Sequence, residues 1–228
     1  MGDFKGFPDA AFAFLEGLAT HNEKKWFDAN RETYQEALIA PAVTFVETMA
    51  GPLSKISKTL RVEPRINGSI RRINRDIRFS KDKAPYKTHL DIMFTEGDAR
   101  MCGTSSLFFR MFGGRLVIGA GAHDFSKEAI GPYRDAVVDA KLGPALTKAI
   151  GAVKKAGNKT GGAHYKRVPT GYGSGHPNAP YLLHGGLYAY AEMPIPKEAS
   201  SSKLVPFCIK RYENLAPLHN WLRDALSR

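Results

Sequence analysis

The densest group of side chains able to do chemistry in this 228-residue sequence lies between residues 71 and 87. Its members are three arginines, an aspartate, a lysine and a tyrosine: Arg72, Arg75, Asp76, Arg78, Lys83 and Tyr86. Arginine presents a planar fork that holds phosphate or carboxylate through two hydrogen bonds. Lysine adds a mobile positive charge, and tyrosine offers a hydroxyl donor or a stacking face. The segment therefore predicts a site that binds an anion.

The same residues would also suit an internal network of ion pairs. Asp76 lies between Arg75 and Arg78, so its carboxylate could neutralise a neighbouring guanidinium. Residues 61–87, however, hold nine basic and three acidic side chains, which leaves several cations without a local partner. Clustered positive charges repel one another unless an anion joins them. We therefore favour a phosphate- or carboxylate-bearing small ligand, and keep a structural or interaction module as an alternative.

The spacing of residues does not decide whether this segment is helical or extended. A helix would gather its isoleucines on one face and its arginines on another. An extended chain would set Arg75 opposite Arg72 and Arg78. Both layouts bring guanidinium groups together.

A second candidate segment runs from Arg167 to Pro177 and includes Tyr172 and His176. Glycines alternate through its middle, so its backbone is permissive and could wrap a ligand. It matches neither a P-loop nor a dinucleotide fingerprint. His176 precedes a proline, which holds it out of the helical region. A histidine there could act as a general acid or base, but we favour a role in capping the following turn, and we add Arg167, Tyr172 and His176 to the predicted ligand-binding residues.

Metal binding and nucleophilic catalysis find little support. His89 and Asp91 would share one face of a strand, where a third ligand could come from His123, Asp124 or Glu192. No spacing demands this arrangement, so we expect a solvent-facing polar edge and no metal site. The sequence also lacks a Gly-x-Ser-x-Gly elbow. It assigns no reaction and no cofactor.

The overall charge suggests a second function. The chain carries 33 basic and 22 acidic side chains, for a net charge of +11. Residues 140–191 contain seven basic side chains and no acidic one. Such a balance is typical of nucleic-acid-binding proteins, so a non-catalytic nucleic-acid binder is an alternative function. The two basic segments would form one strong positive field if they meet in space, and would only aid solubility on opposite faces.

The composition fits a folded cytoplasmic protein. Hydrophobic residues make up 43% of the chain, which excludes a disordered or fibrous protein. No apolar run approaches the roughly 20 residues that span a bilayer, and we expect neither a signal peptide nor a membrane partner. The two cysteines, Cys102 and Cys208, lie far apart and in no redox or metal spacing. The oligomeric state stays open.

Residue patterns predict helices first, then strands, then helices again. Pro8, Asn22 and Asn30 mark helix starts, Pro41 a kink or restart, and Gly51-Pro52 a helix end. The later elements are predicted as a strand over 90–94, a hairpin over 107–112 and 115–118 ended or bulged by glycines 119–121, helices over 126–140 and 143–157, a loop over 157–175, a helical turn over 177–183, a strand over 187–191 and a helix over 204–226.

This order predicts an α+β fold, in which an antiparallel sheet carries the N-terminal and C-terminal helices on it. Repeated βαβ units would instead alternate strands and helices along the chain. No linker or repeat is visible, so we expect a single domain over residues 1–228.

The string Arg72-x-x-Arg75-Asp76-x-Arg78-Phe79-x-x-x-Lys83-x-x-Tyr86 resembles the signature of a bacterial family of uncharacterised proteins. This family is catalogued as a domain of unknown function, number twenty-four sixty-one. The early Trp26-Phe27 pair and the segment from Arg167 to Pro177 fit it as well, so the resemblance covers most of the chain. It implies no activity, substrate or cofactor. The motif residues carry over as the family signature alone.

Overall fold

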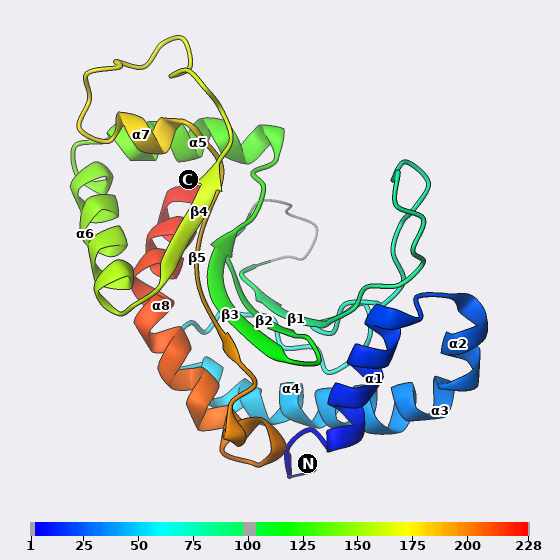
Figure 1. Cartoon of the computed structure of the whole chain (residues 1–228). Coiled ribbons are helices and arrows are strands. Elements are labelled where there is room, and N and C mark those ends of the chain that lie inside the picture. The colour runs from blue at the N-terminus through cyan, green and yellow to red at the C-terminus, as the bar shows by residue number, and fades with distance from the viewer. Residues whose placement is uncertain (1–2, 98–103, 228) are drawn as a thin grey trace.

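The computed structural model describes residues 3–97 and 104–227, so Cys102 lies outside the described residues. Figure 1 shows a curved sheet with helices around it. The helices are α1 (Asp9–Thr20), α2 (Lys24–Ala29), α3 (Arg31–Thr33), a π-helical stretch η1 (Tyr34–Ile39), α4 (Ala40–Leu53), α5 (Lys127–Val138), α6 (Leu142–Lys155), α7 (Ala179–Leu182), a 3₁₀ turn η2 (Lys197–Ser200) and α8 (Leu204–Leu226).

The strands form one five-stranded sheet in which every neighbouring pair is antiparallel. They are β1 (Leu90–Thr95), β2 (Ser106–Met111), β3 (Arg115–Ala122), β4 (Lys159–Ala163) and β5 (His184–Pro194). Their order across the sheet is β1-β2-β3-β5-β4, which leaves β1 and β4 as the two edges. The predicted α+β class with an antiparallel sheet is confirmed.

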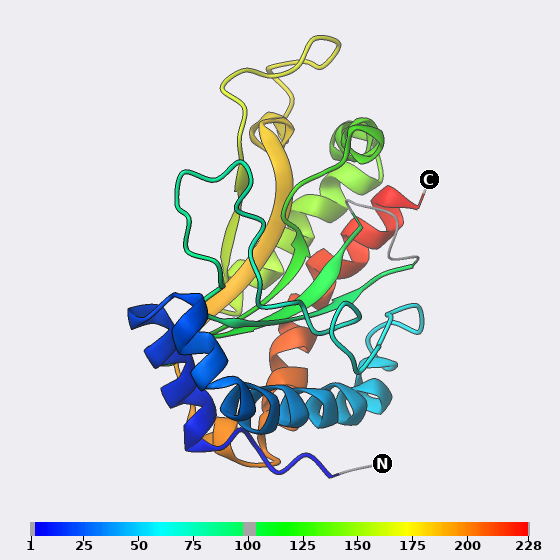
Figure 2. The same ribbon diagram turned by 90° about the vertical axis from the view of Figure 1, so that its right-hand side faces the viewer.

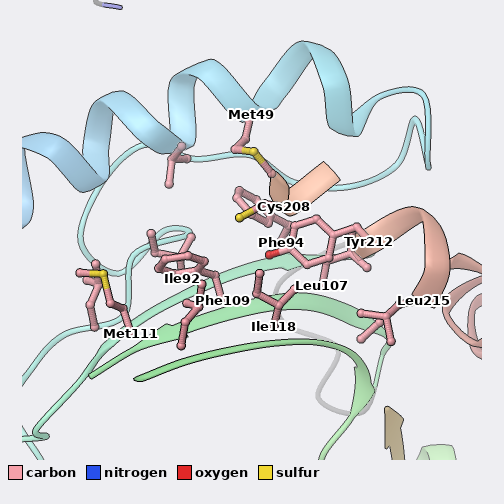
Figure 3. Close-up of a cluster of buried hydrophobic side chains, with 14 of the residues drawn as sticks. Met49, Ile92, Phe94, Leu107, Phe109, Met111, Ile118, Cys208, Tyr212 and Leu215 are labelled. Carbon is pink, nitrogen blue, oxygen red and sulfur yellow. The ribbon is translucent and has the colours of Figure 1, made fainter. Parts of the chain in front are cut away.

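The convex face of the sheet carries the core. Alternate residues of β1, β2 and β3 point to this face, where α4 and α8 cover them (Figures 1 and 3). Met49 of α4 and Tyr212 of α8 meet Ile92, Phe94 and Phe109 there, and all five side chains are buried. This burial fixes the register, because a shift of one residue would expose the whole apolar set.

Two predictions about single strands were wrong. The glycines at 119–121 do not end or bulge β3, which continues in regular register to Ala122. A Cβ atom on Gly119 would lie 2.1 Å from the ring of Phe108, so this glycine makes room for a neighbouring side chain. The predicted loop over 157–175 contains β4, an edge strand whose sequence Lys-Thr-Gly-Gly-Ala has no alternation of apolar and polar residues to announce it.

The N-terminal helices also differ from their predicted boundaries. The predicted restart at Pro41 is confirmed: α4 begins at Ala40 with Pro41 in its first turn, directly after the π-helical stretch η1. Pro52 lies inside α4 instead of after it. Asn22 caps no helix, and its side chain binds a segment 64 residues further along the chain.

Candidate functional site

Residues 71–87, which we call the arm, form neither a helix nor a regular strand. The arm folds back on itself: Arg75 N donates to Pro85 O at 2.9 Å, and Lys87 N donates to Ile73 O at 2.8 Å. Its base joins the sheet edge, since Arg71 N donates to Asp91 O in β1. In Figures 1 and 2 the arm stands beside the β1 edge, on the concave side of the sheet.

Tyr86 anchors the arm to the N-terminal helices. Its ring is 6% exposed and stacks on Phe27, with 4.3 Å between the ring centroids. Asn22 binds both polar groups of its backbone: Nδ2 donates to Tyr86 O, and Oδ1 accepts from Tyr86 N. We assign this tyrosine to packing, because a ligand cannot reach a ring that Phe27 already covers.

Most of the signature cations have partners within the arm. Arg75 donates to Asp82 at 2.6 Å and to Ala84 O at 2.9 Å. Arg78 makes a two-pronged pair with Asp76, with distances of 3.0 and 2.7 Å, which lowers the pKa of that carboxyl. Each of these pairs involves a carboxylate that remains exposed to solvent.

The remaining signature residues are more open. Lys83 Nζ donates only to a backbone oxygen, that of Ile77, at 3.0 Å. Arg72 is exposed and pairs with no carboxylate among the residues that the structure describes. Phe79, at the tip of the arm, is 94% exposed and lies under the guanidinium of Arg78. The arm thus combines a paired interior with free positive charge at its surface.

A cluster of charged residues that the sequence did not predict lies where the arm meets the sheet. Asp91 points to the concave face and is 9% exposed. Its carboxylate accepts from Arg110 Nε at 2.6 Å and contacts His89 Nε2 at 3.1 Å, and Lys87 Nζ lies 3.6 Å away. Burial would raise the pKa of Asp91, but the hydrogen bonds from His89 and Arg110 outweigh it and hold that pKa well below its usual range.

Arg71 adds a further cation to this cluster. Its Nε lies 3.4 Å from the sulfur of Met93, the next residue of β1 on the same face. It pairs with no carboxylate in the described part of the chain. One buried carboxylate therefore faces Lys87 and Arg110, and Arg71 lies beside them over Met93, so positive charge is left over even with His89 neutral.

Aromatic side chains occupy the rest of the concave face. The register places Met93, Phe108, Gly119 and Tyr190 in one row across the sheet, with Tyr188 in the next row. The two tyrosine rings lie 6.0 Å apart, and His123 adds a nearly parallel ring 5.5 Å from Tyr188. The aromatic rings of the two rows, Phe108, Tyr188 and Tyr190, are partly exposed, in contrast to the buried side chains of the convex face.

The second predicted segment stands at the opposite edge of the sheet. It follows β4, whereas the arm adjoins β1 (Figure 1). Tyr172 donates its hydroxyl to Asp135 at 2.7 Å, and His176 Nδ1 accepts from the backbone N of Asn178 at 3.0 Å. The histidine therefore caps the following turn. Arg167 is exposed and has no carboxylate partner within the described residues. The structure does not bring this segment together with the arm.

A buried polar network lies between the end of β1 and α8. His219 of α8 is fully buried between Glu96 Oε1 at 2.9 Å and Ser105 Oγ at 2.7 Å. Thr59 donates to the second oxygen of Glu96 at 2.5 Å. The hydroxyl of Ser105 is 0% exposed, so no substrate can reach it and the trio is a structural element.

The described residues hold no group of three histidine, cysteine, aspartate or glutamate side chains placed to bind a metal ion. His89 and Asp91 do share one face, but they bind each other and Asp91 is buried, so the expected solvent-facing edge was wrong. Cys208 is also buried, which raises the pKa of its thiol far above the ordinary value.

Sequence reasoning missed Arg110, and it counted Arg71 and Lys87 among the cations of the segment without listing them as ligand-binding residues, although the signal for part of the cluster is present. The alternation in 90–94 places Asp91 opposite the buried Ile92, hence on the free face. The partnership with Arg110 depends on the register between β1 and β2, which local pattern does not fix.

The arrangement defines a class of α+β protein with an antiparallel sheet whose concave face is lined by aromatic and basic side chains. The chain belongs to the family of conserved hypothetical proteins DUF2461, whose model matches residues 10–221. No curated protein and no solved structure matches it. Among the described residues, no helix is long and apolar enough to cross a membrane.

Proposed function

We propose that this protein binds a small anion, carrying phosphate or carboxylate, on the concave face of its sheet beside the arm. The observation that carries the proposal is the surplus of cations around Asp91. A lone internal ion pair needs one cation for one carboxylate, whereas Lys87 and Arg110 both reach Asp91 and Arg71 adds a third cation beside Met93. Their side chains are held by β1, β2 and the base of the arm, so an anion would meet a prepared site.

The proposed site lies at the base of the arm, whereas the sequence predicted it along the middle of the signature. Arg75, Arg78 and Lys83 already hold contacts within the arm, so their main role is to shape it. Arg72 stays in the proposed site as the signature cation without a carboxylate partner, and Arg71 and Lys87 join it. No reaction is assigned, because the contacts among the described residues point to anion binding and to no particular chemical step.

Titration calorimetry with pyrophosphate and citrate tests the proposal. Arg71→Gln and Lys87→Gln should each weaken binding roughly tenfold, the effect of losing a charge-assisted hydrogen bond. Neither change leaves Asp91 unpaired, since Arg110 remains. Lys154→Gln, on the exposed side of α6 behind the sheet, is the matched control and should bind as the parent protein does. Equal affinities in all four proteins would refute the proposed site.

A further inference from the structure

Two aromatic rings of the concave face lie over glycines of the neighbouring strands. A Cβ atom on Gly119 would lie 2.1 Å from Cζ of Phe108, and one on Gly161 would lie 2.6 Å from Cζ of Tyr188. The end of each ring therefore occupies the space that a side chain at the glycine would fill. Both rings are partly exposed on this face.

The rings lie close to the surplus cations. Phe108 and Arg110 are two residues apart on β2, which places them on the same face with a separation of about 7 Å along the strand. Tyr190 lies in the same row as Phe108, across Gly119. At the far end of this row stands Lys159 of β4, which is exposed. The rings of Phe108 and Tyr190 therefore have positively charged side chains near them on both β2 and β4.

We propose that the anion bound on this face is a nucleotide, whose base stacks on Phe108 and Tyr190 while its phosphate binds Arg71, Lys87 and Arg110. This inference rests on the proposed function and adds the second half of the ligand. A purely aliphatic phosphate would use the cations and leave the aromatic faces in water. Bases stack on aromatic side chains whatever their sequence, and the neighbouring cations neutralise phosphate. A free nucleotide and a single-stranded nucleic acid share this chemistry.

Titration calorimetry with four probes separates the two halves of the ligand. The probes are adenosine 5′-monophosphate, adenosine, ribose 5-phosphate and a short oligothymidylate. The proposal expects adenosine 5′-monophosphate to bind roughly tenfold more tightly than ribose 5-phosphate, as stacking of one base should provide. Binding of oligothymidylate but not of the mononucleotide would support the same chemistry and identify a nucleic acid as its source.

Two variants test the rings directly. Phe108→Leu and Tyr190→Leu keep apolar bulk but remove the π-face, so each should abolish most of the preference for adenosine 5′-monophosphate and leave ribose 5-phosphate binding unchanged. Tyr165→Leu is the matched control, because this tyrosine is 41% exposed in the segment after β4. Thermal melting of each variant verifies that it is folded.

The outcomes are distinct. If ribose 5-phosphate and the nucleotide bind equally well, the nucleotide is refuted and the anion site stands. If both leucine variants keep the preference in folded protein, the stacking surface is refuted. If no phosphate compound binds at all, this inference falls, and the proposed function falls with it only if citrate also fails to bind.

Discussion

Glu96 shows what a buried, hydrogen-bonded carboxylate does at the scale of single residues. Burial raises the pKa of Glu96, but hydrogen bonds from His219 and Thr59 outweigh it and lower that pKa to about 2. The unfolded chain protonates this group near its ordinary value of about 4.5. The carboxylate therefore contributes stability that is complete above that value and is lost as the pH falls toward 2.

The exchange Glu96→Gln tests this contribution. We expect the variant to lose about 3 kcal/mol of unfolding free energy at neutral pH, since the folded pKa lies well below the unfolded one. The loss should shrink as the pH falls below about 4, because the parent protein then loses the same interaction. Urea unfolding at several pH values measures both. A difference that does not vary with pH would show that the charge of Glu96 is not what stabilises the fold.

Phe79 represents the opposite extreme, a large apolar side chain in open water. Because it is 94% exposed, its removal should change the unfolding free energy by no more than about 0.5 kcal/mol. Phe79→Ser and the buried-ring exchange Phe109→Ser give the contrast, since Phe109 is 1% exposed and belongs to the core. A large loss of thermal stability in Phe79→Ser would mean that the tip of the arm packs on the protein.

At the scale of elements, the arm depends on one arginine more than on the other. Arg75 is 27% exposed and joins two stretches of the arm through Asp82 and the backbone of Ala84. Arg78 is 76% exposed, and its ion-pair partner among the described residues is Asp76, two residues away. Exposed pairs of that kind contribute between about 0 and 1 kcal/mol.

We therefore expect Arg75→Ala to lower the unfolding free energy by about 1–2 kcal/mol and Arg78→Ala to leave it nearly unchanged. Denaturant titration of the two variants measures the difference. Equal and large losses would favour the alternative in which the whole signature is an internal ion-pair network.

A second prediction at the scale of elements concerns strand β3. Gly119→Ala should destabilise the protein by about 1–3 kcal/mol, because its Cβ would collide with Phe108 and with the backbone oxygen of Ala189. Gly114→Ala, in the turn before the same strand, meets no atom within 4 Å and is the matched control. Melting curves of the two variants compare them. If Gly119→Ala melts with the parent protein, the ring of Phe108 does not occupy the space over Gly119.

These elements also show what sequence can and cannot predict here. Helix α8 was predicted nearly to its ends, because Leu215, Leu218 and Leu222 repeat with the helical period and bury one face. Strand β4 was missed, because its glycines carry no periodic pattern and its place is set by pairing with β5. The cluster of charged residues around Asp91 was not predicted for the same reason. Asp91 and Arg110 meet through the register of β1 and β2, which is a tertiary property.

At the scale of the whole molecule, the two basic segments lie at opposite edges of one sheet. The arm adjoins β1, and the segment containing Lys166 and Arg167 follows β4 (Figure 1). The arrangements considered from sequence describe this only in part, because the basic segment over residues 140–191 is divided between α6, which lies behind the sheet, and the loop after β4. Four strand spacings separate the edges, or roughly 19 Å. A small ligand held at Asp91 cannot touch Arg167, whereas a longer strand crossing the aromatic face can.

Arg167→Gln therefore distinguishes a small ligand from a polymer. Its affinity for adenosine 5′-monophosphate should equal that of the parent protein, because the phosphate binds at the far edge. If a single-stranded nucleic acid crosses the face, the variant should bind oligothymidylate more weakly, and the slope of log affinity against log salt should fall by about 0.7, the value for one lost phosphate contact on a single strand. Anisotropy titrations over a range of salt concentrations give both quantities. An unchanged slope would confine the ligand to the β1 side of the sheet, and a loss of mononucleotide affinity would contradict the separation of the two basic segments.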